Sequence, residues 1–378
     1  MKIILQLSLL LLIGFLAFNL QACDRRQELY ILNWDEYIDY DLVDKFEKEY
    51  NCDVILNIAQ SNETMFTKIA GDAAPYDLVF PSDYMISQMV NYKELGKAKP
   101  LIKPIDFTKL ENYSEESFDS NLISLINKDC YEIKDYFIPY FWGSLGIMYN
   151  TKRLSSEQIE LIHQYGYDVL FDSSILGKKV KIGMYASARD SVASALIHKG
   201  YSLNTKNKEE LKEAKIVLDE MDYFKWDTDD LKTDVANGIL DIALVYSGDF
   251  FDMLYSSYSS VDDGEEPIIN YNMYSPQDHN NVFFDGMCIP ITSRSTDLAY
   301  KFIDFMIKHE NALTNASYVG YCPTLSSVYN EILYDPEFEG IADLEPYYPG
   351  SIANGEVYQY LGIDIYKYYD KIYQAVKD

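Results

Sequence analysis

Residues 29–58 read LYILNWDEYIDYDLVDKFEKEYNCDVILNI, and this stretch predicts a strand, a helix and a second strand in succession. Residues 29–33 and 53–58 are apolar runs of strand length, and residues from about Asp41 to Tyr50 carry apolar side chains on one helical face. A strand, a crossover helix and another strand form the repeating unit of parallel sheets covered by helices on both faces. The stretch therefore predicts an α/β fold.

The same alternation continues along the chain. Ser61 is placed to cap a helix after the second strand, and residues 138–150 form a long β-rich stretch interrupted by Gly143 and Gly146. We expect this long stretch to run from one lobe to another. The further elements that we expect are strands at 77–80, 178–183, 240–246 and 283–290, helices at 188–199, 208–221, 249–257, 297–310 and 363–376, and an irregular excursion at 258–281 with a solvated acidic tip at 262–266.

Length and charge limit the function classes. The chain has 378 residues, which is enough for two domains, and 60 acidic against 32 basic residues give a formal charge of −28. A nucleic-acid partner requires a basic patch, and the sequence shows none. The excess of acidic residues is compatible with a cationic ligand. It is equally compatible with a negative charge whose only role is to keep the protein soluble.

The N-terminus has the pattern of an export signal. Lys2 is the only charged residue before Asp24, the run from 3 to 18 is almost wholly apolar, and it ends in Leu20-Gln21-Ala22-Cys23. This ending resembles a bacterial lipobox, which implies a signal peptide at 1–22, a lipidated Cys23, a tether at 23–28, and a periplasmic protein anchored to the membrane. The alternative is an ordinary signal peptide with an incidental cysteine.

The cysteines after residue 23 match no metal motif. Their spacing is wide and irregular, which is unlike a zinc site, and their even number permits disulfides without pairing them. We expect mostly buried free thiols at Cys52, Cys130, Cys288 and Cys322.

Enzyme signatures are missing from the sequence. It has no Gly-x-Ser-x-Gly elbow, no Gly-rich phosphate loop and no His-Glu-x-x-His, so we expect no enzyme, no cofactor and no bound metal. Aromatic and acidic residues instead recur together at predicted strand ends, where open parallel sheets bind ligands. Aromatic faces attract organic ammonium groups, and buried carboxylates need cationic partners. The pattern therefore predicts a site for a flexible chain with positive ends.

Six stretches together resemble one family, the periplasmic spermidine- and putrescine-binding proteins of bacterial ABC importers. Their order and spacing agree over nearly the whole mature chain. They are LYILNWDEYI (29–38), SNETMFTKI (61–69), YDLVFPSDYM (76–85), IPYFWGSLGIMYN (138–150), FFDGMCIP (283–290) and GYCPT (320–324).

The resemblance implies a two-lobed type II periplasmic-binding-protein fold, in which each lobe is a mixed, mainly parallel sheet flanked by helices. The lobes are joined by hinge crossings and close over the ligand. It places the N-terminal lobe at 29–138 and 286–317 and the C-terminal lobe at 139–285 and 318–378. The implied function is capture of putrescine or spermidine by a monomer that delivers it to a membrane permease.

The resemblance also implies the ligand-binding residues. Asp285 matches the main amine-binding acid of the family, Tyr246 replaces a family Trp, and the match at Gln359 is loose. The full predicted set is Trp34, Glu36, Tyr37, Ser82, Tyr84, Ser187, Asp190, Tyr246, Asp249, Phe283, Asp285, Tyr321 and Gln359.

Two departures from the family pattern concern ligand choice. Spermidine-type members carry an acid where this chain has Ser187, and Asp249 in YSGD looks like the putrescine-type arrangement, with Asp249 and Asp285 around one ammonium. We therefore favour putrescine, with spermidine second. The alternatives are a ferric-ion or other small-ligand receptor that uses Tyr347-Tyr348 or Tyr368-Tyr369, an exported enzyme, and a structural lipoprotein without a transport role.

Overall fold

A computed structural model describes residues 26–71, 75–261, 267–334 and 344–377 of the chain. The predicted signal peptide, the lipidation at Cys23 and residues 23–25 of the tether lie outside the described residues, and the tether ends earlier than predicted because Gln27 and Glu28 belong to a strand. The predicted acidic tip at 262–266 also lies outside them. Among the described residues, no helix combines the length and the low polarity that crossing a bilayer requires.

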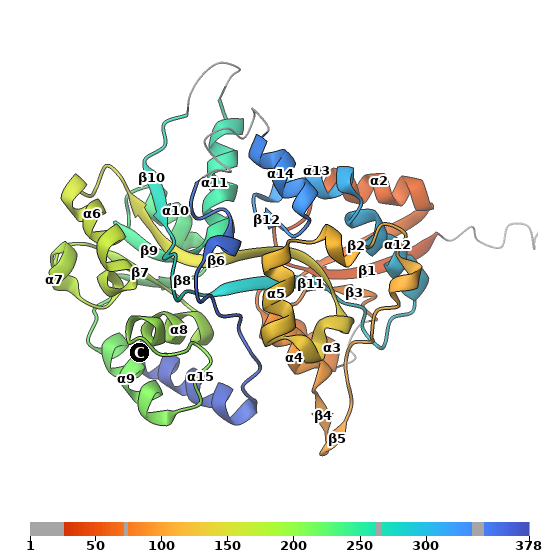
Figure 1. Ribbon diagram of the computed structural model, residues 1–378, viewed down its shortest axis with the longest axis horizontal. Coiled ribbons are helices and arrows are strands. Elements are labelled where there is room, and N and C mark those ends of the chain that lie inside the picture. Colours follow the sequence, from red (N-terminus) through yellow and green to blue (C-terminus); the bar gives the residue numbers. More distant parts are fainter. Residues whose placement is uncertain (1–25, 72–74, 262–266, 335–343, 378) are drawn as a thin grey trace, which may run out of the picture.

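Strand β6 (Ile138–Asn150) runs through the middle of the molecule (Figure 1), and all 13 of its positions are buried. Its first half pairs antiparallel with β11 (Val282–Met287) and with β12 (Cys322–Pro323). Its second half pairs antiparallel with β9 (Ile242–Tyr246) and with β10 (Tyr271–Tyr274). One continuous strand thus serves the two sides of the fold, without the interruption that its two glycines predict.

The N-terminal sheet has the strand order β2-β1-β3 and is parallel. Its strands are β1 (Gln27–Asn33), β2 (Cys52–Ile58) and β3 (Leu78–Val79), and the helices after them are α2 (Tyr40–Tyr50), α3 (Asn62–Ala70) and α4 (Asp83–Val90). The Ser61 side chain accepts a hydrogen bond from the backbone N–H of Thr64, so the predicted cap of α3 is confirmed.

The second sheet has the order β10-β6-β9-β7-β8, in which β7 (Ile182–Tyr185), β8 (Lys225–Asp227) and β9 are parallel. The helices that follow these strands are α8 (Ala188–His198), α9 (Lys208–Asp219), α10 (Asp230–Ala236) and α11 (Ser247–Ser259). The C-terminal helix α15 (Ile363–Lys377) packs beside α8 and α9 (Figure 1).

The remaining elements are shorter or lie at the edges. A hairpin of β4 and β5 projects from the body beside α3 and α4 (Figure 1). The bounds are β4 (Lys93–Glu94), β5 (Lys97–Ala98), α5 (Ser120–Asp129), α6 (Ser156–Tyr165), α7 (Ser173–Leu176), α12 (Thr296–Met306), α13 (His309–Val319) and α14 (Ser326–Tyr334).

Backbone hydrogen bonds join the N-terminal sheet to the chain around β11. Val79 and Cys288 exchange two of them, at 2.9 and 2.8 Å, and Gly286 N donates to the Pro81 carbonyl at 3.0 Å. The register of β11 against β6 shifts between Phe284 and Gly286, where Asp285 alone faces Tyr140 and Phe141, so the extra residue of this bulge lies in β6. Asp285 itself forms an isolated antiparallel bridge with Ser82, which brings this acid beside the loop after β3.

Two expectations about the elements were wrong. The stretch 258–281 is not wholly irregular, because its residues 271–274 form β10 and pair with β6. A strand of four residues with alternating burial, flanked by turn-forming residues, is too short for its periodicity to be recognised in the sequence. The helix expected at 297–310 ends at Met306, and α13 starts at His309. The lobe boundaries stay a prediction.

The cysteines agree with the expectation. Cys52, Cys130, Cys288 and Cys322 are all buried and free. Burial raises the pKa of the Cys288 and Cys322 thiols well above the ordinary value, so both remain neutral side chains of the core.

Gly146 of β6 has no room for a side chain. An added Cβ would lie 2.3 Å from Met273 Cε and 2.7 Å from the Tyr274 carbonyl oxygen. We expect Gly146→Ala to lower the free energy of unfolding by about 1–3 kcal/mol, because the β10 backbone must move away from β6. The measurement is urea unfolding of the variant and the parent. An unchanged midpoint would show that β10 is not held in this register.

Candidate functional site

Loops at the carboxyl ends of parallel strands carry most of the predicted site residues. Trp34 to Tyr37 follow β1, Ser82 and Tyr84 follow β3, Asp190 lies in the first turn of α8 after β7, and Asp249 lies in the first turn of α11 after β9. Asp285 and Phe283 come from within β11, and Tyr246 is the last residue of β9.

Asp285 is a buried carboxylate with one unused oxygen. The Tyr37 hydroxyl donates to Asp285 Oδ2 at 2.7 Å, whereas Oδ1 is buried without a hydrogen-bond partner among the described residues. Burial raises the pKa of Asp285 from 3.8 to about 6. The nearby Ser82 and Tyr37 hydroxyls lower this pKa, but by less than burial raises it. No hydrogen bond joins the nearby Ser82 hydroxyl to Oδ1, so Oδ1 is the open oxygen of this carboxylate.

Two tyrosines in contact with each other, Tyr321 and Tyr37, connect Asp249 to Asp285. The Tyr321 hydroxyl donates to Asp249 Oδ1 at 3.1 Å, and the Tyr321 ring meets the Tyr37 ring edge to face at 4.9 Å. Burial raises the pKa of Asp249 to about 6, while the charge of Lys232 lowers it. Burial also raises the pKa of the Tyr37 and Tyr321 phenols well above 10.0, so both remain neutral donors.

Asp190 forms a third acidic position. Its Oδ1 atom accepts hydrogen bonds from the hydroxyls of Tyr246 and Tyr358, each at 2.8 Å. The carboxylate is 4% exposed. The Ser187 hydroxyl, at the N-cap of α8, accepts from the Asp190 backbone N–H at 3.4 Å and so orders the turn that carries this acid.

A line of aromatic rings connects the three acids. The Phe283 ring lies 6.2 Å from Tyr321 and 4.9 Å from Tyr246, in both cases edge to face. The rings of Tyr37, Tyr321, Phe283 and Tyr246 therefore follow one another from Asp285 to Asp190. Such a wall offers π-faces and edges along an aliphatic chain and places carboxylates near its ends.

Other predicted residues lie at the margin of this group. Trp34 donates through Nε1 to the Phe80 carbonyl at 2.7 Å, and Glu36 is exposed with a left-handed backbone (φ 50°). The Tyr84 hydroxyl donates to Glu63 at 3.1 Å. Gln359 makes its contacts through the backbone, since its N–H donates to Asn204 and its carbonyl accepts from Arg189.

Three residues near the site were not predicted from the sequence. Tyr358 binds Asp190, and Lys232 approaches Asp249 to 3.7 Å. The Arg189 guanidinium is buried among the rings of Tyr84, Tyr358 and Tyr369, with distances of 4.6–5.5 Å from its central carbon to the ring centres. Arg189 and Tyr358 adjoin the predicted residues Asp190 and Gln359 in the sequence, and this adjacency is a signal that could have identified them. No sequence signal distinguishes Lys232.

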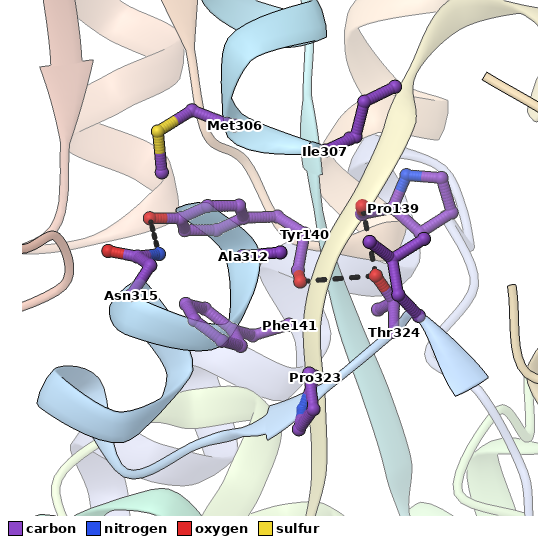
Figure 2. Close-up of a pocket in the computed structure, with 10 residues that line it drawn as sticks. Pro139, Tyr140, Phe141, Met306, Ile307, Ala312, Asn315, Pro323 and Thr324 are labelled. Carbon is purple, nitrogen blue, oxygen red and sulfur yellow. Dashed lines mark hydrogen bonds between the residues drawn. The ribbon is translucent and has the colours of Figure 1, made fainter. Parts of the chain in front are cut away.

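A small cavity of about 20 Å³ is lined in part by Tyr140 and Phe141 (Figure 2), whose rings contact the Tyr37 ring, and none of the site acids lines it. The Tyr140 hydroxyl, beside this cavity, accepts from Asn315 at 2.8 Å and donates to the Tyr37 carbonyl at 2.9 Å. A volume of this size holds about one water molecule. The cavity is too small for a polyamine, so we assign its surroundings to the support of Tyr37 and not to ligand binding.

The tyrosine pairs of the ferric alternative do not converge. Tyr347 is buried against Phe251, and Tyr348 donates to Asp119 at 2.8 Å. Tyr369 donates to the carbonyls of Leu203 and Thr205. Among the described residues, no group of three or more His, Cys, Asp or Glu side chains has an arrangement that suits a metal ion. The geometry does not favour a ferric site.

Comparison with known proteins places the chain in a family. Residues 41–340 match the bacterial extracellular solute-binding proteins, and the chain belongs to this family. A protein of Listeria monocytogenes named as a spermidine/putrescine ABC transporter is 33% identical, with a TM-score of 0.75 over 93% of this chain and 99% of the other. This likeness confirms the two-lobed α/β fold.

Two further relatives are similar over most of their length. The putrescine-binding periplasmic protein of Pseudomonas aeruginosa is 28% identical over 80% of this chain and 79% of its own. A lipoprotein of Treponema pallidum is 26% identical, with a TM-score of 0.69 over 93% of this chain and 99% of the other. The resemblance found in the sequence is thereby confirmed at the level of the family.

The raised pKa of Asp285 has a consequence for stability. The folded protein holds this proton more tightly than the unfolded chain does, so between about pH 4 and pH 6 the ligand-free protein loses stability as the pH rises. A shift of this size corresponds to about 2–3 kcal/mol at pH 7. We therefore expect Asp285→Asn to be more stable than the parent by about this amount at pH 7, and nearly equal at pH 4.

The measurement is urea unfolding of both ligand-free proteins at the two pH values. Groups other than residue 285 titrate in both proteins and cancel in the difference. A variant that is no more stable than the parent at pH 7 would show that the ionised carboxylate is well solvated or paired.

Proposed function

We propose that this chain is the substrate-binding lipoprotein of a polyamine ABC importer. It captures putrescine or spermidine between its two lobes as a periplasmic monomer and passes the ligand to the membrane permease. It binds without chemical transformation. The lobes are those expected from the sequence, 29–138 with 286–317 and 139–285 with 318–378, and the ligand contacts are the predicted site residues.

The open oxygen of Asp285 carries this proposal. A buried carboxylate without a cationic partner is unfavourable, and a cation that reaches it relieves the cost of burial. No nitrogen of Lys, Arg or His lies within 4.0 Å of Asp285 in the part of the chain that the structure describes. The missing partner is therefore best supplied by a ligand, and an ammonium group fits it.

The surrounding rings support an aliphatic amine over an inorganic cation. Tyr37, Tyr321, Phe283 and Tyr246 present apolar surface between the acids, which suits methylene groups and offers little to a hydrated metal ion. A polyamine joins both requirements in one molecule, because its ammonium groups are separated by short methylene chains.

The names of the relatives agree with the proposal. The Pseudomonas aeruginosa protein is named as binding putrescine, and the Listeria monocytogenes protein is named for spermidine and putrescine. The Treponema pallidum relative is named as a lipoprotein, which supports an anchor at Cys23 of this chain. Its lipobox-like sequence supports the same anchor.

Binding of putrescine tests the proposed function. We expect one molecule of putrescine to bind per chain in a calorimetric titration of the protein, purified in detergent and freed of amines by dialysis. Asp285→Asn removes the charge that pairs with the ammonium, and we expect it to weaken binding by about 100-fold.

Asp297→Asn is the matched control. Asp297 is an exposed acid that pairs with Lys109 at 2.9 Å outside the site, so its loss should leave the affinity unchanged. A parent protein that binds neither putrescine nor spermidine would refute the proposed function. Equal losses in the two variants would instead indicate a nonspecific effect of net charge.

Labelling with a radioactive fatty acid tests the anchor. We expect the parent to incorporate palmitate in its native bacterium and to fractionate with membranes, whereas Cys23→Ser should incorporate none, because the thiol accepts the lipid. Cys130→Ser, which changes a buried cysteine, is the control and should keep the label. Label on the Cys23→Ser protein would contradict lipidation at this residue.

A further inference from the structure

Lys232 is a partly buried lysine beside the acids of the site. Its side chain is 14% exposed, and its Nζ lies 2.9 Å from Asp252 Oδ2 and 3.7 Å from Asp249 Oδ1. Burial disfavours its charge, but Asp249, Asp252 and then Glu36 prevail and hold the pKa of Lys232 above its ordinary value. The ammonium group is therefore a fixed positive charge within the group of acids.

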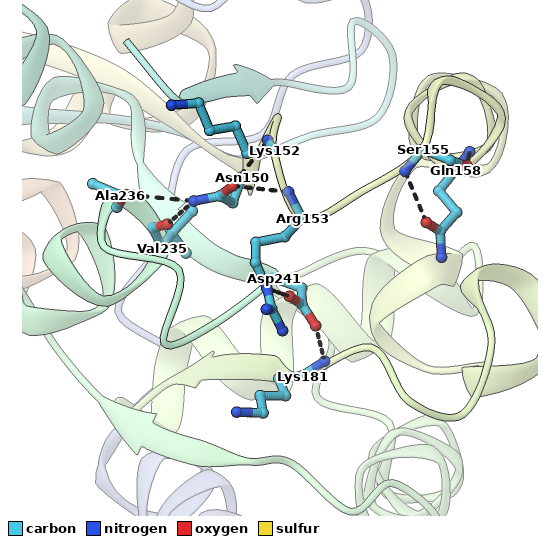
Figure 3. A network of polar contacts seen from close by, with 9 residues as sticks. All are labelled: Asn150, Lys152, Arg153, Ser155, Gln158, Lys181, Val235, Ala236 and Asp241. Carbon is cyan, nitrogen blue, oxygen red and sulfur yellow. Dashed lines mark hydrogen bonds and ion pairs between the residues drawn. The ribbon is translucent and has the colours of Figure 1, made fainter. Parts of the chain in front are cut away.

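The helix that carries Lys232 is held firmly in place. Asn150, at the end of β6, donates through Nδ2 to the carbonyls of Val235 at 2.7 Å and Ala236 at 3.4 Å (Figure 3). Leu231 and Val235 of α10 are fully buried. Lys232 therefore extends toward Asp249 from a rigid support, and its ammonium cannot leave without giving up both acids.

The three acids of the site differ in their access to cations. Asp249 already has the Lys232 ammonium as a neighbour, whereas no nitrogen of Lys, Arg or His in the described residues lies within 4.0 Å of Asp190 or Asp285. Arg189, the nearest residue to Asp190 in sequence, gives its hydrogen bonds to Asn204 and to the Gln359 carbonyl. Two acids are thus left for a ligand.

We propose that Lys232 is a resident ammonium that neutralises Asp249 and makes the site selective for diamines over triamines. This inference rests on the proposed function. A diamine supplies two ammonium groups, one for Asp285 and one for Asp190, with its methylenes along the aromatic rings. A triamine adds a third ammonium group. Asp249 is already paired with Lys232, so this third group has no free carboxylate to bind, and the Lys232 ammonium repels it. Lys232 is therefore a specificity-determining residue of this site.

Lys232→Met tests the inference, because Met keeps the length of the side chain and removes the charge. It leaves Asp249 open to a third ammonium group. We expect the ratio of spermidine to putrescine affinity to rise by about tenfold in calorimetric titrations, given the strength of a charge pair at this separation inside a protein. Asp249→Asn removes one negative charge and leaves Lys232 paired with Asp252, so the ratio should move the opposite way.

Lys225→Met is the matched control. Lys225 also pairs with two acids, Asp227 at 2.8 Å and Asp234 at 2.6 Å, but its side chain is 33% exposed and contacts no residue of the site. Its loss should leave the ratio unchanged. If Lys232→Met does not fold, the opposite shift in Asp249→Asn carries the test.

The outcomes separate the inference from the proposed function. If the parent binds polyamines and neither variant changes the ratio, the inference is overturned and the proposed function stands. If the parent binds no polyamine but Lys232→Met does, the resident ammonium is confirmed and the proposed function of the native chain fails. If no protein binds an amine, both fail.

Discussion

The fold depends on one fully buried strand, β6, which pairs with four other strands. β6 pairs through its first half with β11 and β12 and through its second half with β9 and β10, so its register sets the positions of the strands that carry Phe283, Asp285 and Tyr246. Gly146 allows β10 to approach, and a bulge in β6 places both Tyr140 and Phe141 opposite Asp285. A one-residue slip would turn each side chain of these partners to the opposite face of the sheet, and the acid would be lost from the site.

The site maintains buried acids by surrounding them with neutral donors. Tyr37, Tyr321, Tyr246 and Tyr358 each donate a hydroxyl to a carboxylate, and burial keeps these phenols protonated. Hydroxyl groups satisfy some oxygen lone pairs without cancelling the negative charge. The acids therefore stay fixed in position while the demand for a cation persists, which is the condition for a preorganised amine site. The same demand lowers the stability of the empty protein near neutral pH, so binding strength and stability are in opposition here.

Much of this could be predicted from the sequence, for a definite physical reason. Periodic apolar runs give strands and helices, and in a parallel sheet the carboxyl ends of the strands lie on one edge, so Trp34 to Tyr37, Ser82, Tyr84 and Asp249 could be expected near one another. The strand β10 and the break between α12 and α13 could not, because four residues or a two-residue gap give no usable period. Lys232 was missed for a different reason. Its sequence neighbours are those of a surface helix, and only the packing of α10 against α11 brings it to Asp249.

Counting acids in a sequence therefore overstates the positive charge that a site demands. Asp249 and Asp285 look equivalent in the family pattern, since both are acids at corresponding positions, yet one has a resident partner and the other has an open oxygen. The charge that a ligand must balance is the net charge of the site, which includes the protein's own cations. This net charge depends on contacts between segments far apart in the chain. A relative that keeps every acid but replaces the lysine with an apolar residue would present one more unpaired carboxylate. Within this architecture, ligand preference can change at α10 while every residue that touches the ligand stays the same.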